Sequence, residues 1–302
     1  MFVPITGPLP VPTNDGYRAA RGLGIIENPP DSQYPDPRWQ QGYRFRRYPC
    51  SGGFVGDPCD HTTSNPSPTS PGQIEGRPFV VRANRKCSTF GMAALDLAVD
   101  ARALLNLVRY AQVAHEIWTG TQAKASGWGN RYLADDSDPD FVDLVTTSGG
   151  DPTTDSFSAL DGLAAVEQAL WDCTDGVRVI HAPAAALVYW DNGGALRYEG
   201  GRVFTTTGSL VVTERGYDGT GPDSLGNVGP TVADPAFWVY GTGPLLVRFD
   251  AQPTITPEPA DGLAAAIARG TNDVEYMAEM LAMATWDCCH VAARISRTPT
   301  VS

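Results

Sequence analysis

The stretch that decides the fold is "AALDLAVDARALLNLVRYAQVAHEIW", Ala93 to Trp118. Apolar side chains recur through it at alternating spacings of three and four residues, which places them on one face of an α-helix. Such a helix is a rod of roughly 37 Å, and Gly120 ends it. The stripe predicts a helix that packs one face on a neighbouring layer; its members are Leu97, Ala101, Leu104, Val108, Ala111, His115 and Trp118.

The chain before this helix has a different composition. Residues 1–42 contain eight prolines and little hydrophobic periodicity, so we predict an extended arm. The arm carries more apolar side chains than a solvated tail normally keeps, Trp39 among them. We therefore expect the arm to lie on another surface, and not on its own chain.

Two β-like runs follow the arm: "YRFRRYPC" (Tyr43 to Cys50) and "RPFVVRANRKC" (Arg77 to Cys87). They flank a segment rich in Gly, Pro, Ser and Thr, and the first run alternates in the way a half-exposed strand does. The two runs predict a long β-hairpin. Because an isolated two-stranded hairpin is marginal in water, it also needs a neighbour.

The chain after the rod helix alternates helices and strands. We predict a helix from Ser156 to Cys173 capped by Asp155 or Ser156, then a strand "GVRVIHA" and a helix "PAAALVYWDN". Short strands with glycine turns follow, and "AFWVYGTGPLLVRFD" is a long strand interrupted at Gly-Thr-Gly. The last region begins with strand alternation, although Met277 to Met283 would also suit a helix. The predicted fold class is α+β.

The stretch "MATWDCCHVAARI", Met283 to Ile295, brings an aspartate, two cysteines and a histidine together. In a strand, Cys288 and His290 point to one face and Cys289 to the other, so the two cysteines cannot easily share one metal. A Cys288/His290 pair would need two further ligands. We interpret the stretch as one packed strand in which the cysteines act as small hydrophobic side chains.

The cysteines around the predicted hairpin leave three alternatives open. Cys50, Cys59 and His61 form C-x8-C-x-H, and Cys87 follows the hairpin, which is not a standard zinc spacing. The alternatives are a metal site, a disulfide that involves Cys50, Cys59 or Cys87, and three thiols near an interface, which we favour. The N-terminal sequence shows no export signal, so we expect reduced thiols during folding.

An acidic stretch resembles the beginning of a calcium-binding loop, with aspartates at positions 136, 138 and 140. The resemblance fails where the loop needs glycine and glutamate, because Phe141 and Thr147 occupy those positions. We therefore predict a solvated acidic loop and no metal site.

The sequence argues against several classes of function. The net charge is −12, with +3 in residues 1–92 and −15 in residues 93–302, and an acidic body repels phosphate backbones. No run of about 18 apolar residues suits a membrane span. His115 fits the apolar stripe, as a core or interface histidine, better than it fits a catalytic base. With no nucleophile elbow and no phosphate loop, we predict no catalytic residue and no cofactor. A soluble hydrolase with paired carboxylates is the alternative from another class.

The parts, taken in order, resemble the major capsid protein of tailed bacteriophages, whose fold encapsulins share. The resemblance lies in the arm, the hairpin, the rod helix, "VIHAPAAALVYWDNGG", "GSLVVTERGY" and the terminal strands. Three segments also resemble capsid-region proteins of phages that infect actinobacteria: "RPFVVRANRKCSTFG", "HEIWTG" and "RGTNDVEYMAEMLAMATWDCCH". The resemblance implies an N-terminal arm (1–42), an extended loop (43–88), a peripheral domain with a spine helix (89–150), an axial domain (151–249) and closing peripheral strands (250–302).

The resemblance also implies a function. It implies a structural virion protein, not an enzyme, that self-assembles as hexamers and pentamers into an icosahedral shell around double-stranded DNA. It would be found in the virion and, during assembly, in the host cytoplasm. A portal protein and a possible scaffold or decoration protein are the implied partners; DNA is enclosed without sequence-specific binding, and no membrane is involved. A minor virion component of the same fold, or an encapsulin-type compartment shell, is the alternative.

The subunit contacts are expected on the arm and the extended loop. Lysine occurs only at positions 86 and 124, so the lysine-to-asparagine cross-link of some family members would depend on Lys86, and we expect none. The candidate subunit-contact residues are Trp39, Arg44, Arg46, Arg47, Phe79 and Lys86.

Overall fold

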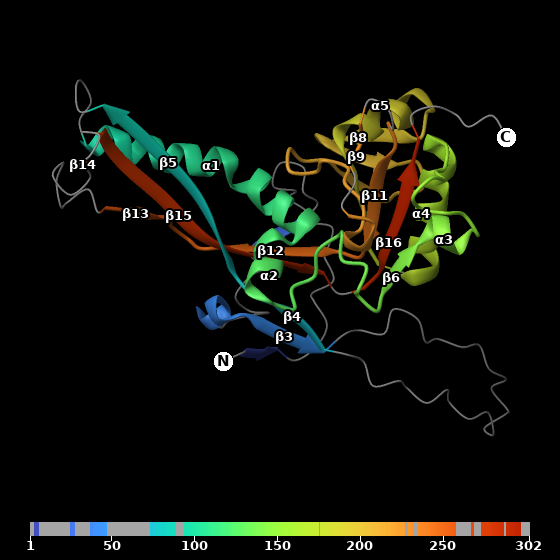
Figure 1. The fold of residues 1–302 in the computed structure, drawn as a ribbon, viewed down its shortest axis with the longest axis horizontal. Coiled ribbons are helices and arrows are strands. Elements are labelled where there is room, and N and C mark those ends of the chain that lie inside the picture. Colours follow the sequence, from blue (N-terminus) through green and yellow to red (C-terminus); the bar gives the residue numbers. More distant parts are fainter. Residues whose placement is uncertain are drawn as a thin grey trace.

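The structure is a computed structural model of the 302-residue chain. It describes residues 3–5, 25–27, 37–46, 73–88, 94–174, 176–226, 229–231, 235–257, 267–268, 273–286 and 288–296. The predicted α+β class is confirmed. Figure 1 shows two parts, which we call the elongated lobe, built on one long helix and one long strand, and the compact lobe, built around a seven-stranded sheet.

The elongated lobe has two layers. Helix α1 (Ala94–Thr119) lies along the antiparallel pair β5 (Phe79–Ser88) and β15 (Asp273–Trp286) (Figure 1). Over most of β15, buried and half-buried residues alternate, as expected when one face of a strand packs under a helix. Met277 to Met283 is therefore strand. The remaining strands of this sheet are β12 (Leu245–Phe249), β13 (Thr254–Thr256), β14 (Ile267–Ala268) and β2 (Ile25–Glu27).

The buried face of α1 is rotated from the predicted stripe. Leu105 is fully buried where we expected Leu104, and Ala114 is buried where we expected His115. Of the two alternatives for His115, the core position is wrong because the side chain is exposed, and the interface position stays a prediction. A strict seven-residue repeat drifts by about 20° per heptad around a straight helix, so His115 turns outward, while Trp118 at the end of the stripe stays buried.

The extended loop begins as a hairpin, but its return strand is not the predicted one. Strand β3 (Tyr43–Arg46) pairs antiparallel with β4 (Gln73–Gly76), and β1 (Val3–Ile5) adds in parallel to β3. The run from Arg77 to Cys87, which we predicted to pair with the first run, becomes β5 and pairs with β15 instead. The physical reason is burial: Phe79, Val81 and Ala83 pack into the core under α1, whereas a free hairpin would leave them in water.

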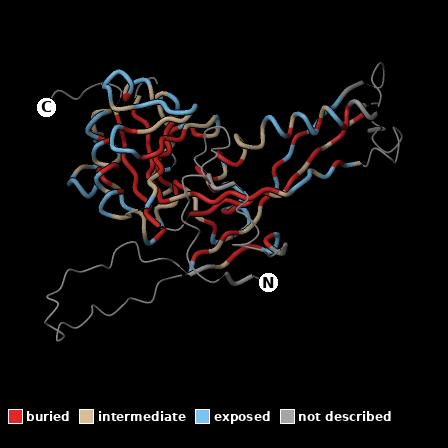
Figure 2. The backbone as a smooth tube through the Cα atoms, turned by 180° about the vertical axis from the view of Figure 1, so that it is seen from behind, coloured by how far each residue is buried: buried red, intermediate tan, exposed pale blue. Residues whose placement is uncertain are grey.

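The compact lobe is one mixed sheet with helices on one face. Helices α4 (Ala159–Cys173) and α5 (Ala184–Asn192) cover that face, and the end of α1 packs against the other (Figure 1). In Figure 2 the buried residues concentrate in these strands and beneath α1. The strand order is β6 (Phe141–Asp143), β16 (His290–Ile295), β11 (Phe237–Thr242), β7 (Val179–His181), β10 (Leu210–Val212), β9 (Arg202–Thr205) and β8 (Leu196–Glu199).

The helix predicted from Ser156 begins three residues later. Ser158 is its N-cap: its hydroxyl oxygen accepts a hydrogen bond from the Asp161 N–H, and its hydroxyl donates to the Asp161 carboxylate. Neither Asp155 nor Ser156 is the cap, because Phe157 is still extended and pairs with the backbone of β16. The short helices are α2 (Thr121–Ser126), α3 (Leu144–Thr147), and 3-10 turns at Pro37–Gln41 and Asp223–Leu225.

Sheet membership divides the chain at places other than the expected domain limits. Strands β6 and β16 belong to the seven-stranded sheet, although they lie outside 151–249, whereas β12 lies inside that range and pairs with β15. The division into a peripheral and an axial domain stays a prediction. Among the helices of the described residues, none is both long enough and apolar enough to cross a bilayer.

Candidate assembly surfaces and the joint between the sheets

The two aromatic residues predicted to contact other subunits are buried in their own chain. Trp39 is 6% exposed and packs with Tyr43, Ile74, Leu246 and Met283, while Phe79 is 5% exposed beneath α1. The arm also contributes β2, which pairs in parallel with β12. The expectation that the arm rests only on other surfaces is therefore wrong for these described parts, because the elongated lobe provides an apolar site for Trp39.

The charged candidates that the structure describes are partly accessible. Arg44 forms an ion pair with Glu75 across the hairpin, and Lys86 Nζ lies 2.9 Å from Asp273 Oδ2. The hydrogen bond with Asp273, together with the charge of that carboxylate, raises the pKa of Lys86. The remaining candidates lie outside the described residues or have side chains that do: Arg46, Arg47, Cys50, Cys59 and Cys87.

Large apolar side chains are exposed on both lobes. On the elongated lobe Leu107 and Val99 face outward from α1, with Leu107 73% exposed. On the compact lobe Trp171 at the end of α4 is 52% exposed, and the Arg178 guanidinium lies 3.7 Å from its ring centroid. The others among the described residues are Val80, Val142, Leu160, Val188 and Tyr198.

Two hollows of the described surface differ in their acidic side chains. One, of about 390 Å³, lies beside α1 and includes His115 and Arg215 in its lining but no acidic side chain. Another, of about 220 Å³, includes Asp135 and Asp138. Asp138 is already paired with Arg131 and His290. Within the described ranges, no group of three or more His, Cys, Asp or Glu residues is placed to hold a metal ion.

The chain crosses between the two sheets at two adjacent places. Gly243 lies between β11 and β12, at the predicted Gly-Thr-Gly interruption, and Cys288 and Cys289 lie between β15 and β16. The Gly243 N–H donates to the Cys288 carbonyl at 2.8 Å. A Cβ at Gly243 would stand 2.8 Å from that oxygen, so only glycine fits there. We call Gly243, Cys288 and Cys289 the joint.

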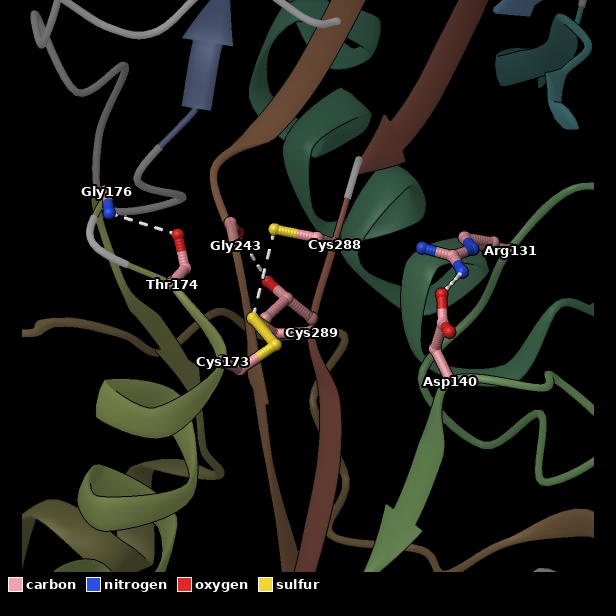
Figure 3. Close-up of a disulfide and its surroundings, with 9 residues drawn as sticks. Arg131, Asp140, Cys173, Thr174, Gly176, Gly243, Cys288 and Cys289 are labelled. Atoms are coloured by element: carbon pink, nitrogen blue, oxygen red, sulfur yellow. Dashed lines mark hydrogen bonds and ion pairs between the residues drawn. A yellow bond between two sulfur atoms is a disulfide. The ribbon is translucent and has the colours of Figure 1, made fainter. Parts of the chain in front are cut away.

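The prediction of one continuous strand with two inert cysteines is wrong at the joint. Strand β15 ends at Trp286 and β16 begins at His290, and Cys289 forms a disulfide with Cys173 at the end of α4 (Figure 3). Cys288 remains a buried thiol, with its sulfur 3.8 Å from that of Cys289. No local pattern could have indicated this pairing, since 116 residues separate the two cysteines.

On the other side of the joint, His290 connects β16 to the segment after α2. Its Nε2–H donates to the Leu133 carbonyl at 2.8 Å, and Nδ1 lies 3.2 Å from Asp138 Oδ2. Arg131 forms ion pairs with both Asp138 and Asp140. Burial by itself would raise the pKa of Asp138, but the hydrogen bond with His290 and the charge of Arg131 outweigh it and lower that pKa.

The prediction of a solvated acidic loop is therefore wrong for Asp138 and Asp140. Asp138 and Asp140 are almost fully buried side chains held by Arg131, and Asp136 accepts a hydrogen bond from the Ser224 N–H at 3.1 Å. These aspartates connect the segment after α2 to β16 and to the turn at Asp223–Leu225. Sequence reasoning missed this because two of the partners, Ser224 and His290, lie 88 and 152 residues away from the aspartates they contact.

His181, on β7, is buried next to the joint. Its Nε2 lies 2.9 Å from the Thr242 hydroxyl and its Nδ1 lies 2.9 Å from the Tyr217 hydroxyl. The Thr242 hydroxyl donates to the Gly243 carbonyl, so it accepts from Nε2–H, and Nδ1 accepts from Tyr217. Burial, helped by the charge of His290, lowers the pKa of His181 to about 3.

We expect this histidine to make the fold sensitive to acid. The unfolded chain protonates His181 below about pH 6.5 while the folded chain keeps it neutral, so the unfolded state takes up the extra proton. The stabilisation is complete above that pH, and about 1.4 kcal/mol is lost per pH unit as the pH falls towards the folded pKa. Urea unfolding at pH 7 and pH 5 measures it. His181→Gln should reduce the difference between the two pH values by about 2 kcal/mol; an unchanged difference would contradict the assignment.

No protein-family model matches the chain, and no curated protein matches its sequence. The chain is similar to several solved structures, all with TM-scores below 0.5. The holo-SrpI encapsulin complex from Synechococcus elongatus has a TM-score of 0.46 and 10% identity over 76% of this chain and 78% of that chain. The structure of Microbacterium phage Oxtober96 has a TM-score of 0.44 and 14% identity over 82% of each chain. The capsid of Ralstonia phage GP4 has a TM-score of 0.44 and 11% identity over 86% of this chain and 84% of that chain.

Proposed function

We propose that the chain is a structural protein that self-assembles into an icosahedral shell enclosing the double-stranded DNA of a tailed bacteriophage. The observation that carries this proposal is the two-layer elongated lobe, in which α1 lies on β5 and β15 and projects from the compact lobe (Figure 1). A layer of helix on a narrow sheet leaves the outer face of each exposed to solvent. Such a shape is best stabilised by identical neighbours on either side, in hexamers and pentamers.

The extended loop supports the proposal because its base is held firmly. Arg46 pairs with Gln73 at the end of the hairpin, so the connection of residues 47–72 begins and ends at one place. The side-chain amide of Asn130 accepts from the Arg77 N–H at 2.7 Å and donates to the Arg77 carbonyl at 2.9 Å. A loop on such a base can contact a neighbouring subunit without the cost of ordering its attachment.

The remaining assignments belong to the same proposal. Residues 1–42 act as the arm, 43–88 as the extended loop, 89–150 and 250–302 as the peripheral domain, and 151–249 as the axial domain. The acidic body of the chain, −15 over residues 93–302, suits a container wall that does not bind DNA tightly. The shell would assemble in the host cytoplasm and join a portal protein in the virion. We propose no catalytic role.

Dynamic light scattering and sedimentation of the purified chain test the proposal. We expect large particles of uniform size, and electron microscopy of those particles should show closed shells. Particles purified from infected cells should contain DNA; a protein cargo in its place would favour an encapsulin-type compartment. Only monomers or dimers at every protein and salt concentration would contradict the shell and favour the hydrolase alternative.

A further inference from the structure

We propose that the Cys173–Cys289 disulfide is a redox-controlled cross-link that fixes the joint against α4. While the two cysteines are thiols, the crossing from β15 to β16 opens locally; once they are oxidised, it is held closed. This inference concerns the joint of the single chain, so it stands or falls independently of shell assembly.

The first observation is the backbone of Cys289. Its φ is +62°, in the left-handed region that side chains other than glycine rarely adopt. A residue in this conformation persists only when its surroundings hold it there. The Cys288 carbonyl before it accepts from Gly243, and His290 after it donates to Leu133. The side chain of Cys289 itself is held by its covalent bond to Cys173.

The second observation is that the other cysteine of the disulfide, Cys173, belongs to a well-packed helix. Cys173 is the last residue of α4, and this helix buries Leu163, Val166 and Leu170 against the seven-stranded sheet. A disulfide from such a helix restrains the joint more than one from a loop would. The cross-link therefore connects a well-packed helix to the strained residue between the two strands.

The third observation connects the two crossings. Because the Gly243 N–H donates to the Cys288 carbonyl, displacement of Cys288 also breaks a bond of the crossing from β11 to β12. Opening at Cys289 is thereby transmitted to Gly243, and the disulfide opposes both movements. In an assembled shell the same cross-link would preserve the arrangement of the two lobes, a consequence that does rest on the proposed function.

The chemistry requires an external oxidant, for which a small-molecule disulfide such as oxidised glutathione is sufficient. A Cys173 or Cys289 thiolate attacks it and forms a mixed disulfide, releasing one glutathione thiol. The second cysteine then displaces the other glutathione and forms the S–S bond. The two cysteines lose two electrons and two protons, and the oxidant becomes two thiols. Reduction reverses these steps, so the site responds to the ratio of thiols to disulfides in the surrounding solution.

Hydrogen exchange with mass spectrometry tests the cross-link on the full chain. The wild type is compared after oxidised glutathione and after reductant, alongside Cys173→Ser and the control Cys288→Ala, which changes the neighbouring buried cysteine that is not in the disulfide. We expect amides of 241–245 and 288–292 to exchange about tenfold faster in the reduced wild type and in Cys173→Ser. Cys288→Ala should keep the roughly tenfold difference between its oxidised and reduced forms, because both cysteines of the disulfide remain.

Peptide mapping without reductant supplies the second readout and requires no variant. After oxidation, Cys173 and Cys289 should be recovered in one linked pair and Cys288 as an alkylated thiol. Equal exchange in the oxidised and reduced wild type would overturn the proposal, and so would recovery of Cys173 and Cys289 as alkylated thiols after oxidation. Particle size plays no part in either readout, so a failed shell proposal would leave both results unaffected.

Discussion

A chain in which Asn-Gly replaces residues 47–72 should fold and yet form no particles. Asn-Gly closes a two-residue hairpin between Arg46 and Gln73, which already pair, so the base of the extended loop is kept. The removed segment is rich in Gly, Pro, Ser and Thr and has few apolar residues to lose from a core. If this loop contacts neighbouring subunits, its loss removes assembly completely, and sedimentation should show only small species. The circular dichroism spectrum of these species should match that of the wild type, because the chain still folds.

The matched control keeps the loop and removes its two cysteines. Cys50→Ser with Cys59→Ser should still form particles, because we favour free thiols there. If this double variant fails to assemble, a disulfide in the loop is required after all, and a ladder on a non-reducing gel of the wild type should then be visible. Full-size particles from the loop-deleted chain would show that the extended loop is not an assembly contact.

Trp118→Ala should lower the free energy of unfolding by about 3–5 kcal/mol, the range for removing a buried aromatic side chain. Trp118 is fully buried at the end of α1, where the elongated lobe meets the compact lobe. Its ring centroid lies 4.9 Å from that of Tyr217 and 5.0 Å from that of Tyr240. Its Nε1–H donates to the hydroxyl of Thr220 at 2.9 Å. Urea unfolding at neutral pH measures the loss.

Trp118→Phe separates the two contributions of this side chain. Phenylalanine keeps much of the apolar contact and loses the indole donor, so we expect a smaller loss, of about 1–2 kcal/mol. Equal losses for Ala and Phe would mean that the hydrogen bond to Thr220, and not the ring packing, stabilises the contact between α1 and the compact lobe.

Local regularity explains which elements could be predicted. The period of the rod helix appears within 26 residues and needs no knowledge of a partner, so its bounds differ from those of α1 by one residue at each end. Strand β15 shows its alternation in the same way. The return strand of the hairpin was misassigned because Arg77 to Cys87 is compatible with two partners. Only the burial of Phe79 and Val81 beneath α1 decides between them.

The surroundings of the candidate residues could be predicted far less well than the helices and strands, because they depend on the tertiary fold. Trp39 was recognised as too apolar for a free arm, yet its resting place on Leu246 and Met283 comes from strands late in the chain. Asp138 looked like part of a solvated loop because its partners, Arg131 and His290, are only partly visible nearby: one is seven residues away and the other 152. A pattern in one segment cannot show what a distant segment brings to it.

By itself, the sequence determined the α+β class, the long helix, the alternation of the long closing strand and the break at Gly243, because helix and strand periods and glycine breaks are properties of neighbouring residues. Only the tertiary structure decided that β5 pairs with β15, that Cys173 bonds Cys289, and that His181 and Asp138 are buried beside the joint. Those outcomes depend on which surfaces meet when the chain closes on itself, and the free energy of that meeting lies in contacts between residues tens to hundreds of positions apart.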